Sequence, residues 1–114
     1  MNKPKIVCLC GSTKFYEQFK EANLQETLKG HVVLSVGVFV HESEKVHGRP
    51  IEITDGQKDA LDDLHEQKIN MADEILVINV GGYTGKSTNK EIERAKMKGK
   101  AIRFWQDEQT NAHT

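Results

Sequence analysis

The side chain with the clearest chemical potential is Glu91, which follows a glycine-rich turn near the start of a predicted helix. Gly81, Gly82 and Gly85 in that turn allow backbone geometries that other residues avoid. Backbone N–H groups converge where such a turn meets a helix, so anions bind there. A glutamate at this place stays ionised at neutral pH. An ionised carboxylate can act as a nucleophile, for which glycosyl transfer is the usual chemistry.

Glu91 also has a purely structural interpretation. Thr88 and Glu91 have the spacing of a capping box, in which the glutamate side chain accepts a hydrogen bond from the N–H of the capping residue. The hydroxyl of Ser87 can cap the same helix. Spacing alone favours the cap over the nucleophile.

The same turn is close to a phosphate-loop motif, because it reads GYTGKST. That motif needs a glycine five residues before the Gly-Lys pair, and Val80 stands at this position. The spacing therefore argues against an NTPase. Contact of the turn with a phosphate or a ribose remains reasonable, and the residues we expect to make it are Gly82, Gly85, Ser87 and Thr88.

A second candidate turn follows the first apolar run and reads CGSTK, from Cys10 to Lys14. Gly11, Ser12 and Thr13 supply flexibility and hydroxyls, and Lys14 supplies a cation at the start of a predicted helix. This combination suits a phosphate or sugar site. An ordinary strand-to-helix turn with a Ser or Thr cap explains the same residues equally well.

Three further polar residues are candidates. His65 and Lys68 lie one turn apart on the second predicted helix, where they can serve as an acid and a phosphate partner or form a solvated face. Asp73 directly precedes a predicted strand, where it can position a ligand or bind backbone N–H groups at the strand start.

The two cysteines, Cys8 and Cys10, point to the same face of the first predicted strand, and neighbours at this spacing rarely form a disulfide. A reduced, cytoplasmic protein is the plain interpretation. No later Cys-x-x-Cys and no close histidine pair completes a metal site, and His41 and His47 are too loosely placed to do so. We therefore expect no metal and no cofactor.

Size and charge limit the function classes. The chain has 114 residues, which suits one domain, and we expect that domain to cover residues 1–105, with a polar tail over residues 106–114. The net charge of −1 provides no basic field for a nucleic acid polymer. No apolar run approaches the roughly 20 residues of a membrane span, and the N-terminus lacks the layout of a signal peptide.

Strands and helices alternate along the chain. Apolar, β-branched runs predict strands over residues 5–10, 31–40, 75–80 and 100–105. Helical spacing and caps predict helices over residues 14–28, over residues 54–71, and from the glycine turn to residue 98. The polar segment 41–53 reads as a mobile loop of the kind that covers a site.

This alternation predicts an α/β fold, a flavodoxin-like doubly wound parallel sheet of about four strands, in the order 2-1-3-4, with helices on both faces. In such sheets ligands bind beyond the carboxyl ends of the strands where the chain reverses direction, here between the first and third strands. The CGSTK turn and the glycine turn both fall there. The two turns therefore predict one shared crevice.

At these residues the chain resembles a known family. The opening KIVCLCGSTKF and the stretch ADEILVINVGGYTGKSTNKEIERA resemble the nucleoside 2-deoxyribosyltransferase-like proteins, which include the 2'-deoxynucleoside 5'-phosphate N-hydrolases. The resemblance implies a flavodoxin-like fold, homo-oligomers, and cleavage of the N-glycosidic bond of a nucleoside or nucleotide. It places Glu91 at the family's attacking glutamate. It also places Gly11 and Ser12 among residues lining the sugar or 5'-phosphate site.

Three positions depart from the family pattern. His65 stands where the family carries an aspartate, and Cys8 stands where a tyrosine is frequent. The glycine turn is longer and carries Lys86, Ser87 and Thr88. The missing aspartate is compatible with protonated His65 acting as the acid, or with binding that is retained without catalysis.

The leading hypothesis is an enzyme that cleaves or transfers the N-glycosidic bond through a Glu91 glycosyl intermediate, which water or a second base resolves. Its partner is a small nucleoside or nucleotide, with a homo-oligomer covering sheet edges and helix faces. The alternative is a module that binds a nucleotide or sugar phosphate without turnover. A weaker third option is a phosphoribohydrolase of the cytokinin-activating type.

Overall fold

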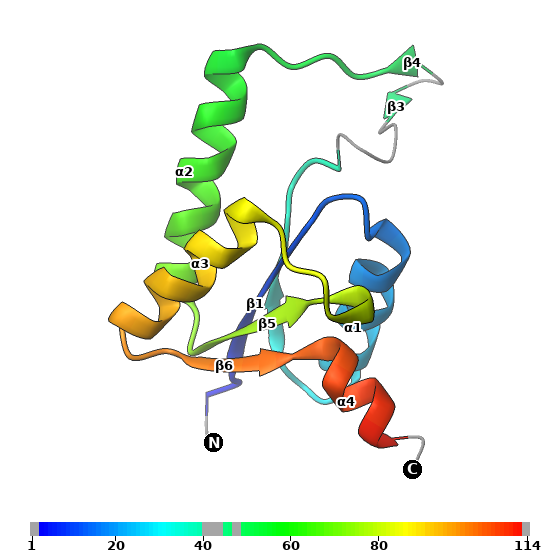
Figure 1. Ribbon diagram of the computed structural model, residues 1–114, viewed down its shortest axis with the longest axis vertical. Coiled ribbons are helices and arrows are strands. Elements are labelled where there is room, and N and C mark those ends of the chain that lie inside the picture. Colours follow the sequence, from blue (N-terminus) through cyan, green and yellow to red (C-terminus); the bar gives the residue numbers. More distant parts are fainter. Residues whose placement is uncertain (1–2, 40–44, 47–48, 113–114) are drawn as a thin grey trace.

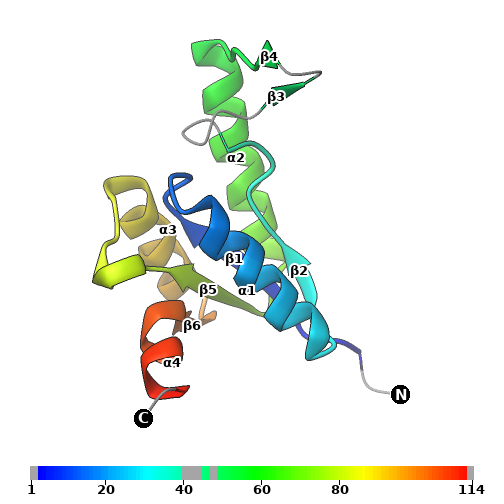
Figure 2. The ribbon, with the colours of Figure 1, turned by 90° about the vertical axis from the view of Figure 1, so that its right-hand side faces the viewer.

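Parallel strands with helices on both sides form the molecule (Figures 1 and 2). The structure, a computed structural model, describes residues 3–39, 45–46 and 49–112. Its strands are β1 (Ile6–Gly11), β2 (Val32–Leu34), β3 (Lys45–Val46), β4 (Arg49–Pro50), β5 (Glu74–Ile78) and β6 (Ala101–Phe104). Its helices are α1 (Tyr16–Leu28), α2 (Asp55–Met71), the short 3₁₀ turn η2 (Val80–Gly82), α3 (Lys86–Met97) and α4 (Trp105–Ala112).

The main sheet has the strand order β2-β1-β5-β6, and every pairing in it is parallel. Counted along the chain, these are the second, first, third and fourth strands of the sheet, so the predicted order 2-1-3-4 and the flavodoxin-like fold are confirmed. The register pairs Cys8 with Ile75 and Gly11 with Ile78, which aligns the carboxyl ends of β1 and β5.

The two faces of the sheet bury separate apolar clusters because β1 and β5 alternate their side chains. Val7 and Leu9 pack with Phe19 of α1 and Trp105 of α4. Cys8 and Cys10 instead face the cluster that contains Ile69 of α2 and, on α3, Ile92 and Ala95. Helices therefore cover both faces, α1 and α4 on one and α2 and α3 on the other.

Helix α2 begins as the sequence predicts. The hydroxyl of Thr54 accepts a hydrogen bond from the Gln57 N–H at 3.1 Å, and the Gln57 side chain accepts one from the Thr54 N–H at 2.9 Å. This reciprocal capping box holds the first turn of the helix. The helix runs on to Met71, as predicted.

The predicted second strand, residues 31–40, is too long. Among residues 31–39, only Val32–Leu34 pair with β1, over Ile6 to Cys8, and Val40 lies outside the described residues. Two tertiary contacts take over where the pairing stops: the Ser35 carbonyl accepts a hydrogen bond from Lys68 Nζ at 2.7 Å, and the Phe39 ring packs edge-on against Tyr16 and Phe19. These contacts draw the segment away from the sheet toward α2 and α1.

Two other predictions need correction. Residues 106–112 of the predicted polar tail are helical in α4, because Trp105 is buried in the core and the Gln106 N–H donates to Asn79 Oδ1 at 2.9 Å. The predicted loop 41–53 contains the antiparallel pair β3–β4, with Lys45 opposite Pro50. Residues 41–44 and 47–48 of that loop, and 113–114 of the tail, lie outside the described residues.

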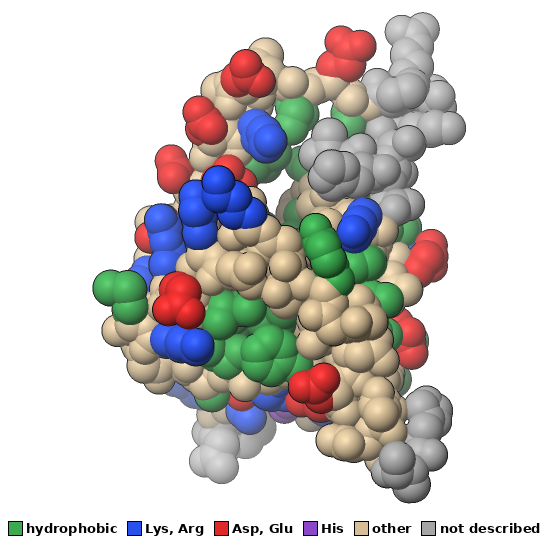
Figure 3. Space-filling model, viewed as in Figure 1, with side chains coloured by type: hydrophobic (Ala, Val, Ile, Leu, Met, Phe, Trp, Pro, Cys, Tyr) green, Lys and Arg blue, Asp and Glu red, His purple; other side chains and the backbone are tan. Residues whose placement is uncertain are grey.

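Charged side chains of both signs are scattered over the face shown in Figure 3, and Lys and Arg gather along α3. Among the helices that the structure describes, none is long and apolar enough to cross a bilayer.

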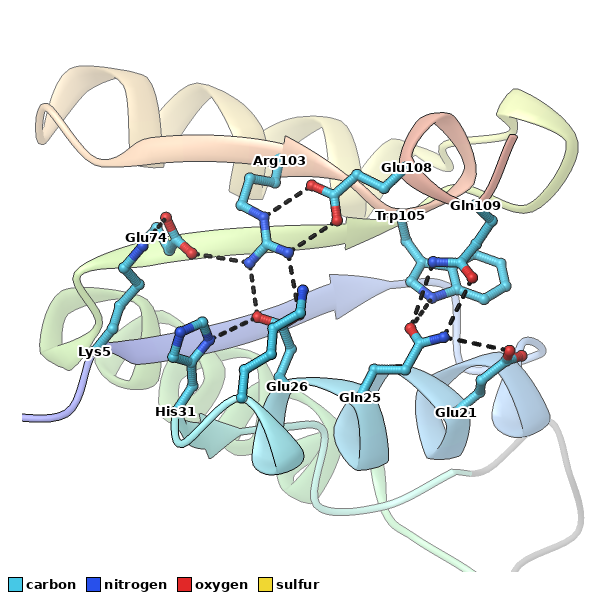
Figure 4. A network of polar contacts seen from close by, with 11 residues as sticks. Lys5, Glu21, Gln25, Glu26, His31, Glu74, Arg103, Trp105, Glu108 and Gln109 are labelled. Atoms are coloured by element: carbon cyan, nitrogen blue, oxygen red, sulfur yellow. Dashed lines mark hydrogen bonds and ion pairs between the residues drawn. The ribbon is translucent and has the colours of Figure 1, made fainter. Parts of the chain in front are cut away.

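A buried ion network joins α1 to the far edge of the sheet (Figure 4). Glu26, 1% exposed, accepts hydrogen bonds from Arg103 at 2.7 and 3.0 Å, from His31 at 2.9 Å and from Lys29 at 3.0 Å. Arg103 also donates to Glu74 and Glu108. Burial alone would raise the pKa of Glu26, but the bonds from Arg103, His31 and Lys29 outweigh it and lower this pKa to about 2.

Glu26 makes the native state sensitive to acid. Because its folded-state pKa lies below the ordinary 4.5, its ion pairs stabilise the fold above that pH, and the contribution disappears as the pH falls toward 2. We expect the urea midpoint to fall steeply across this window. In Glu26→Gln the midpoint is lower at neutral pH, because Arg103 loses a carboxylate partner, and its further decline in acid is shallower. Equal acid slopes in the two proteins would contradict this role.

Candidate functional site

A cavity of about 630 Å³ lies at the carboxyl ends of β1 and β5, between α2 and the start of α3. The CGSTK turn contributes Gly11, Ser12 and Thr13 to its wall, and the glycine turn contributes Gly85. The two turns therefore meet at one crevice, as the sequence predicts. A second hollow is lined by residues of α3 that include Glu93, and neither Glu91 nor His65 lines it.

Most of the predicted site residues line this cavity. From α2 and α3 these are His65, Lys68, Ser87, Thr88 and Glu91. Close packing requires glycine at position 11. The φ of Gly11 is +152°, and an added Cβ would lie 2.9 Å from the Ile78 carbonyl oxygen. Gly11 thus lets the first turn leave the sheet tightly against β5.

Four predicted binding residues do not line the cavity. Cys10 is fully buried beneath it. The Lys14 ammonium lies over the Tyr83 ring, 3.8 Å from its centroid. Gly82 closes the η2 turn, with its N–H bonded to the Asn79 carbonyl at 2.7 Å.

Asp73 stands at the opposite end of the strands from the cavity. Its carboxylate accepts a hydrogen bond from the Ile6 N–H at 2.7 Å, where β1 begins. Its own N–H donates to the Ile6 carbonyl. The structural alternative, a carboxylate that satisfies backbone groups at the strand start, therefore describes Asp73, and its prediction as a binding residue is wrong.

Glu91 is not a helix cap. Helix α3 begins at Lys86 after Gly85, and no side chain caps it, so the predicted capping box of Thr88 and Glu91 does not form. Glu91 is the sixth residue of the helix and faces α2. Its Oε2 lies 2.9 Å from Nε2 of His65, and the two side chains are only 20% and 14% exposed.

His65 also contacts the sulfur of Cys8, which lies 3.8 Å from the same Nε2. Burial alone would lower the pKa of His65, but hydrogen bonds and charge attraction from Cys8 and Glu91 outweigh it and raise this pKa to about 9. The imidazole is therefore protonated at neutral pH.

The pKa values of the two thiols shift in opposite directions. A hydrogen bond from Cys10 lowers the pKa of Cys8 to about 6, against the effect of burial and with help from His65. The hydrogen bond to Cys8, together with burial and the Glu91 charge, raises the pKa of Cys10. Cys8 thus carries thiolate character next to an imidazolium, although no solvent reaches it.

Cationic side chains line the cavity beside the Glu91–His65 pair. They are Lys58, Lys68, Lys86, Lys90 and Arg94. Lys68 is bonded to the Ser35 carbonyl and Arg94 pairs with Glu66. Within the described part of the chain, Lys58, Lys86 and Lys90 have no such partner, so they remain able to bind an anion in the cavity.

Sequence reasoning missed two features of this site. Lys86, Lys90 and Arg94 repeat every four residues on α3, a spacing that predicts one basic stripe and could have been noticed. The contact between Cys8 and His65 joins residues 57 positions apart, and no local pattern signals it.

The Glu91–His65 pair can be tested by titration. We expect NMR of the His65 ring, in buffer containing EDTA, to show a pKa near 9. In Glu91→Gln the value falls, because the carboxylate that stabilises the imidazolium is gone. Glu93→Gln, on the exposed side of the same helix, leaves the value unchanged. An unshifted His65 in Glu91→Gln would show that the two side chains do not pair in solution.

Comparisons with known proteins return no match: no family model fits the chain, and no curated protein or solved structure is similar to it at a significant level. The flavodoxin-like fold therefore rests on the strand order, and the site rests on the distances given above. The resemblance to the nucleoside 2-deoxyribosyltransferase-like proteins stays a prediction from short motifs.

Proposed function

We propose that the protein cleaves or transfers the N-glycosidic bond of a nucleoside or nucleoside 5'-monophosphate, with Glu91 as the nucleophile. The observation that carries the proposal is the 2.9 Å contact between Glu91 and His65 in the wall of a cavity that both turns border. A carboxylate and an imidazolium side by side supply the two groups that such a reaction needs.

The carboxylate is suited to attack. His65 engages Oε2 of Glu91, and the Cys10 thiol also donates a hydrogen bond to this carboxylate. The Glu91 side chain lines the cavity, where the anomeric carbon of a bound sugar would meet it. Attack forms an ester between Glu91 and the sugar while the bond to the base breaks, and the electrons of that bond pass to the base. Water, or a second base, then displaces Glu91 and completes hydrolysis or transfer.

His65 is suited to move the proton. The departing base needs a proton, and the imidazolium of His65 lies in the same corner of the cavity as the nucleophile. In the second step the neutral imidazole takes a proton from the attacking water. This role supports the interpretation that His65 replaces the family aspartate.

The cationic wall favours a phosphorylated substrate. Lys86 and Lys90 on α3 and Lys58 on α2 line the cavity, and the α3 N-terminus, which lacks a side-chain cap, opens toward the same space. Together they provide positive charge for a 5'-phosphate in the cavity that the Glu91–His65 pair also lines. We therefore favour nucleoside 5'-monophosphates over nucleosides.

Release of free base tests the proposal. The protein is incubated with ribo- and deoxyribonucleosides and with their 5'-monophosphates, and chromatography quantifies the base. We expect release from at least one substrate, reduced roughly 1000-fold or more in Glu91→Gln, because removal of a nucleophile leaves only binding effects. Glu93→Gln is the matched control: the same substitution on the same helix, at a 68% exposed side chain.

Other outcomes would favour the other hypotheses. Measurable binding of a monophosphate, with no base released from any substrate, would favour a binding module whose Glu91 is held by His65. Release from ribonucleotides alone would favour a phosphoribohydrolase. Equal activity of wild type and Glu91→Gln would remove Glu91 from the reaction.

The cationic wall is tested by substrate preference. We expect Lys90→Ala to raise KM for a monophosphate about 10-fold, because one charged hydrogen bond to the phosphate is lost. The KM for the nucleoside stays unchanged. Lys96→Ala, a 60% exposed lysine later on α3, changes neither value. An equal rise for both substrates would show that Lys90 does not contact the phosphate.

A further inference from the structure

Beneath the cavity, three side chains that could ligate a metal meet. Sγ of Cys8, Sγ of Cys10 and a ring nitrogen of His65 all lie within 4.8 Å of one another. In the part of the chain that the structure describes, this is the one group of three or more His, Cys, Asp or Glu residues so placed. The proposed function uses neither cysteine.

The separations suit a tetrahedral ion. Ligands at the usual zinc distances, about 2.3 Å for sulfur and 2.1 Å for nitrogen, lie about 3.6 Å apart in a tetrahedron. The observed separation of Cys8 Sγ and His65 Nε2 is 3.8 Å. Two residues apart on β1, Cys8 and Cys10 present both sulfurs to the same face of the sheet, on which α2 packs.

We propose that Cys8, Cys10 and His65 bind a Zn²⁺ ion, with Glu91 completing the coordination on the cavity side. Two thiolates and an imidazole form a soft donor set that selects zinc over magnesium or calcium. The Glu91 carboxylate lines the cavity and lies 2.9 Å from His65 Nε2.

Charge and access both fit this site. On binding, the Cys10 thiol and the His65 imidazolium each give a proton to the solvent, while Cys8 already carries thiolate character. Two protons leave as one divalent ion enters, so the buried site gains no net charge. Both cysteines are 0% exposed. His65 and Glu91 line the cavity, so the ion reaches the sulfurs from there.

Binding of the ion would affect the proposed reaction. This consequence rests on the proposed function, whereas the metal site does not. His65 Nε2 would ligate the metal, and the same atom contacts Glu91 in the present structure. Metal-bound His65 has no proton to donate at Nε2, and Glu91 is held as a ligand. Zinc would therefore inhibit base release, while the site itself exists whether or not the protein is an enzyme.

Cobalt(II) provides a direct probe of the site. Untagged, reduced protein is freed of metal and titrated with Co²⁺, and absorption is recorded in the near ultraviolet and the visible. We expect a thiolate-to-cobalt charge-transfer band and intense tetrahedral d–d bands that saturate at one ion per chain, and equimolar Zn²⁺ removes both. The chain has only two cysteines, so a charge-transfer band can come from Cys8 and Cys10 alone.

Variants then assign the ligands. We expect the charge-transfer band to vanish in Cys8→Ala/Cys10→Ala, and Co²⁺ affinity to fall at least about 100-fold in His65→Asn. Asp62→Asn, at another cavity-lining residue of α2, keeps wild-type affinity. No charge-transfer band in the wild type, or unchanged affinity in a folded His65→Asn, would overturn the proposal. The wild-type spectrum decides even if a cysteine variant fails to fold, and neither result depends on enzymatic activity.

Discussion

Burial of β1 on both faces is the constraint on which the rest of the structure depends. Paired with β2 on one side and β5 on the other, β1 has no solvent-facing side chain from Val7 to Cys10. Its alternate residues must therefore suit two different layers. On one face Val7 and Leu9 pack with large rings, and on the other the small sulfurs of Cys8 and Cys10 leave room for α2. That room brings His65 next to the strand.

The two faces of the sheet also separate the buried ion network from the candidate site. The face under α1 and α4 holds the Glu26–Arg103 network, which ties α1 to β5, β6 and α4 through fully paired charges. The face under α2 and α3 holds the pair of Glu91 and His65. The candidate site therefore lies on the opposite face of the sheet from the ion network.

The sequence predicts the strand order and the start of α2 well, since the signals for them are local. The apolar run and glycine turn before α3, and the Thr54–Gln57 capping box, each act within a few residues, and the strand order follows from alternation. The short β2 and the helical α4 could not be predicted, because they depend on distant partners. Ser35 bonds to Lys68, and Gln106 bonds to Asn79, 27 residues earlier.

In the candidate site, too, some features follow from local sequence signals and others do not. Glu91 could be singled out from its place after a glycine turn, yet its spacing from Thr88 favoured a cap. Gly85 decides between the two roles: it is the N-cap residue, so α3 begins at Lys86 and Glu91 falls at the sixth position of the helix, beyond the reach of a cap. A helix starting three residues later would have used the same carboxylate on its own backbone.

The chemistry of the site then depends on one atom, Nε2 of His65. It lies 2.9 Å from a carboxylate oxygen and 3.8 Å from a thiol sulfur. A protonated Nε2 bridges these two anionic partners and can give its proton to a leaving group, whereas a neutral Nε2 has a lone pair for a metal ion. Proton and metal ion cannot occupy this nitrogen together. Under the two proposals, whichever one the conditions favour would determine whether Glu91 acts as a nucleophile or is held as a ligand.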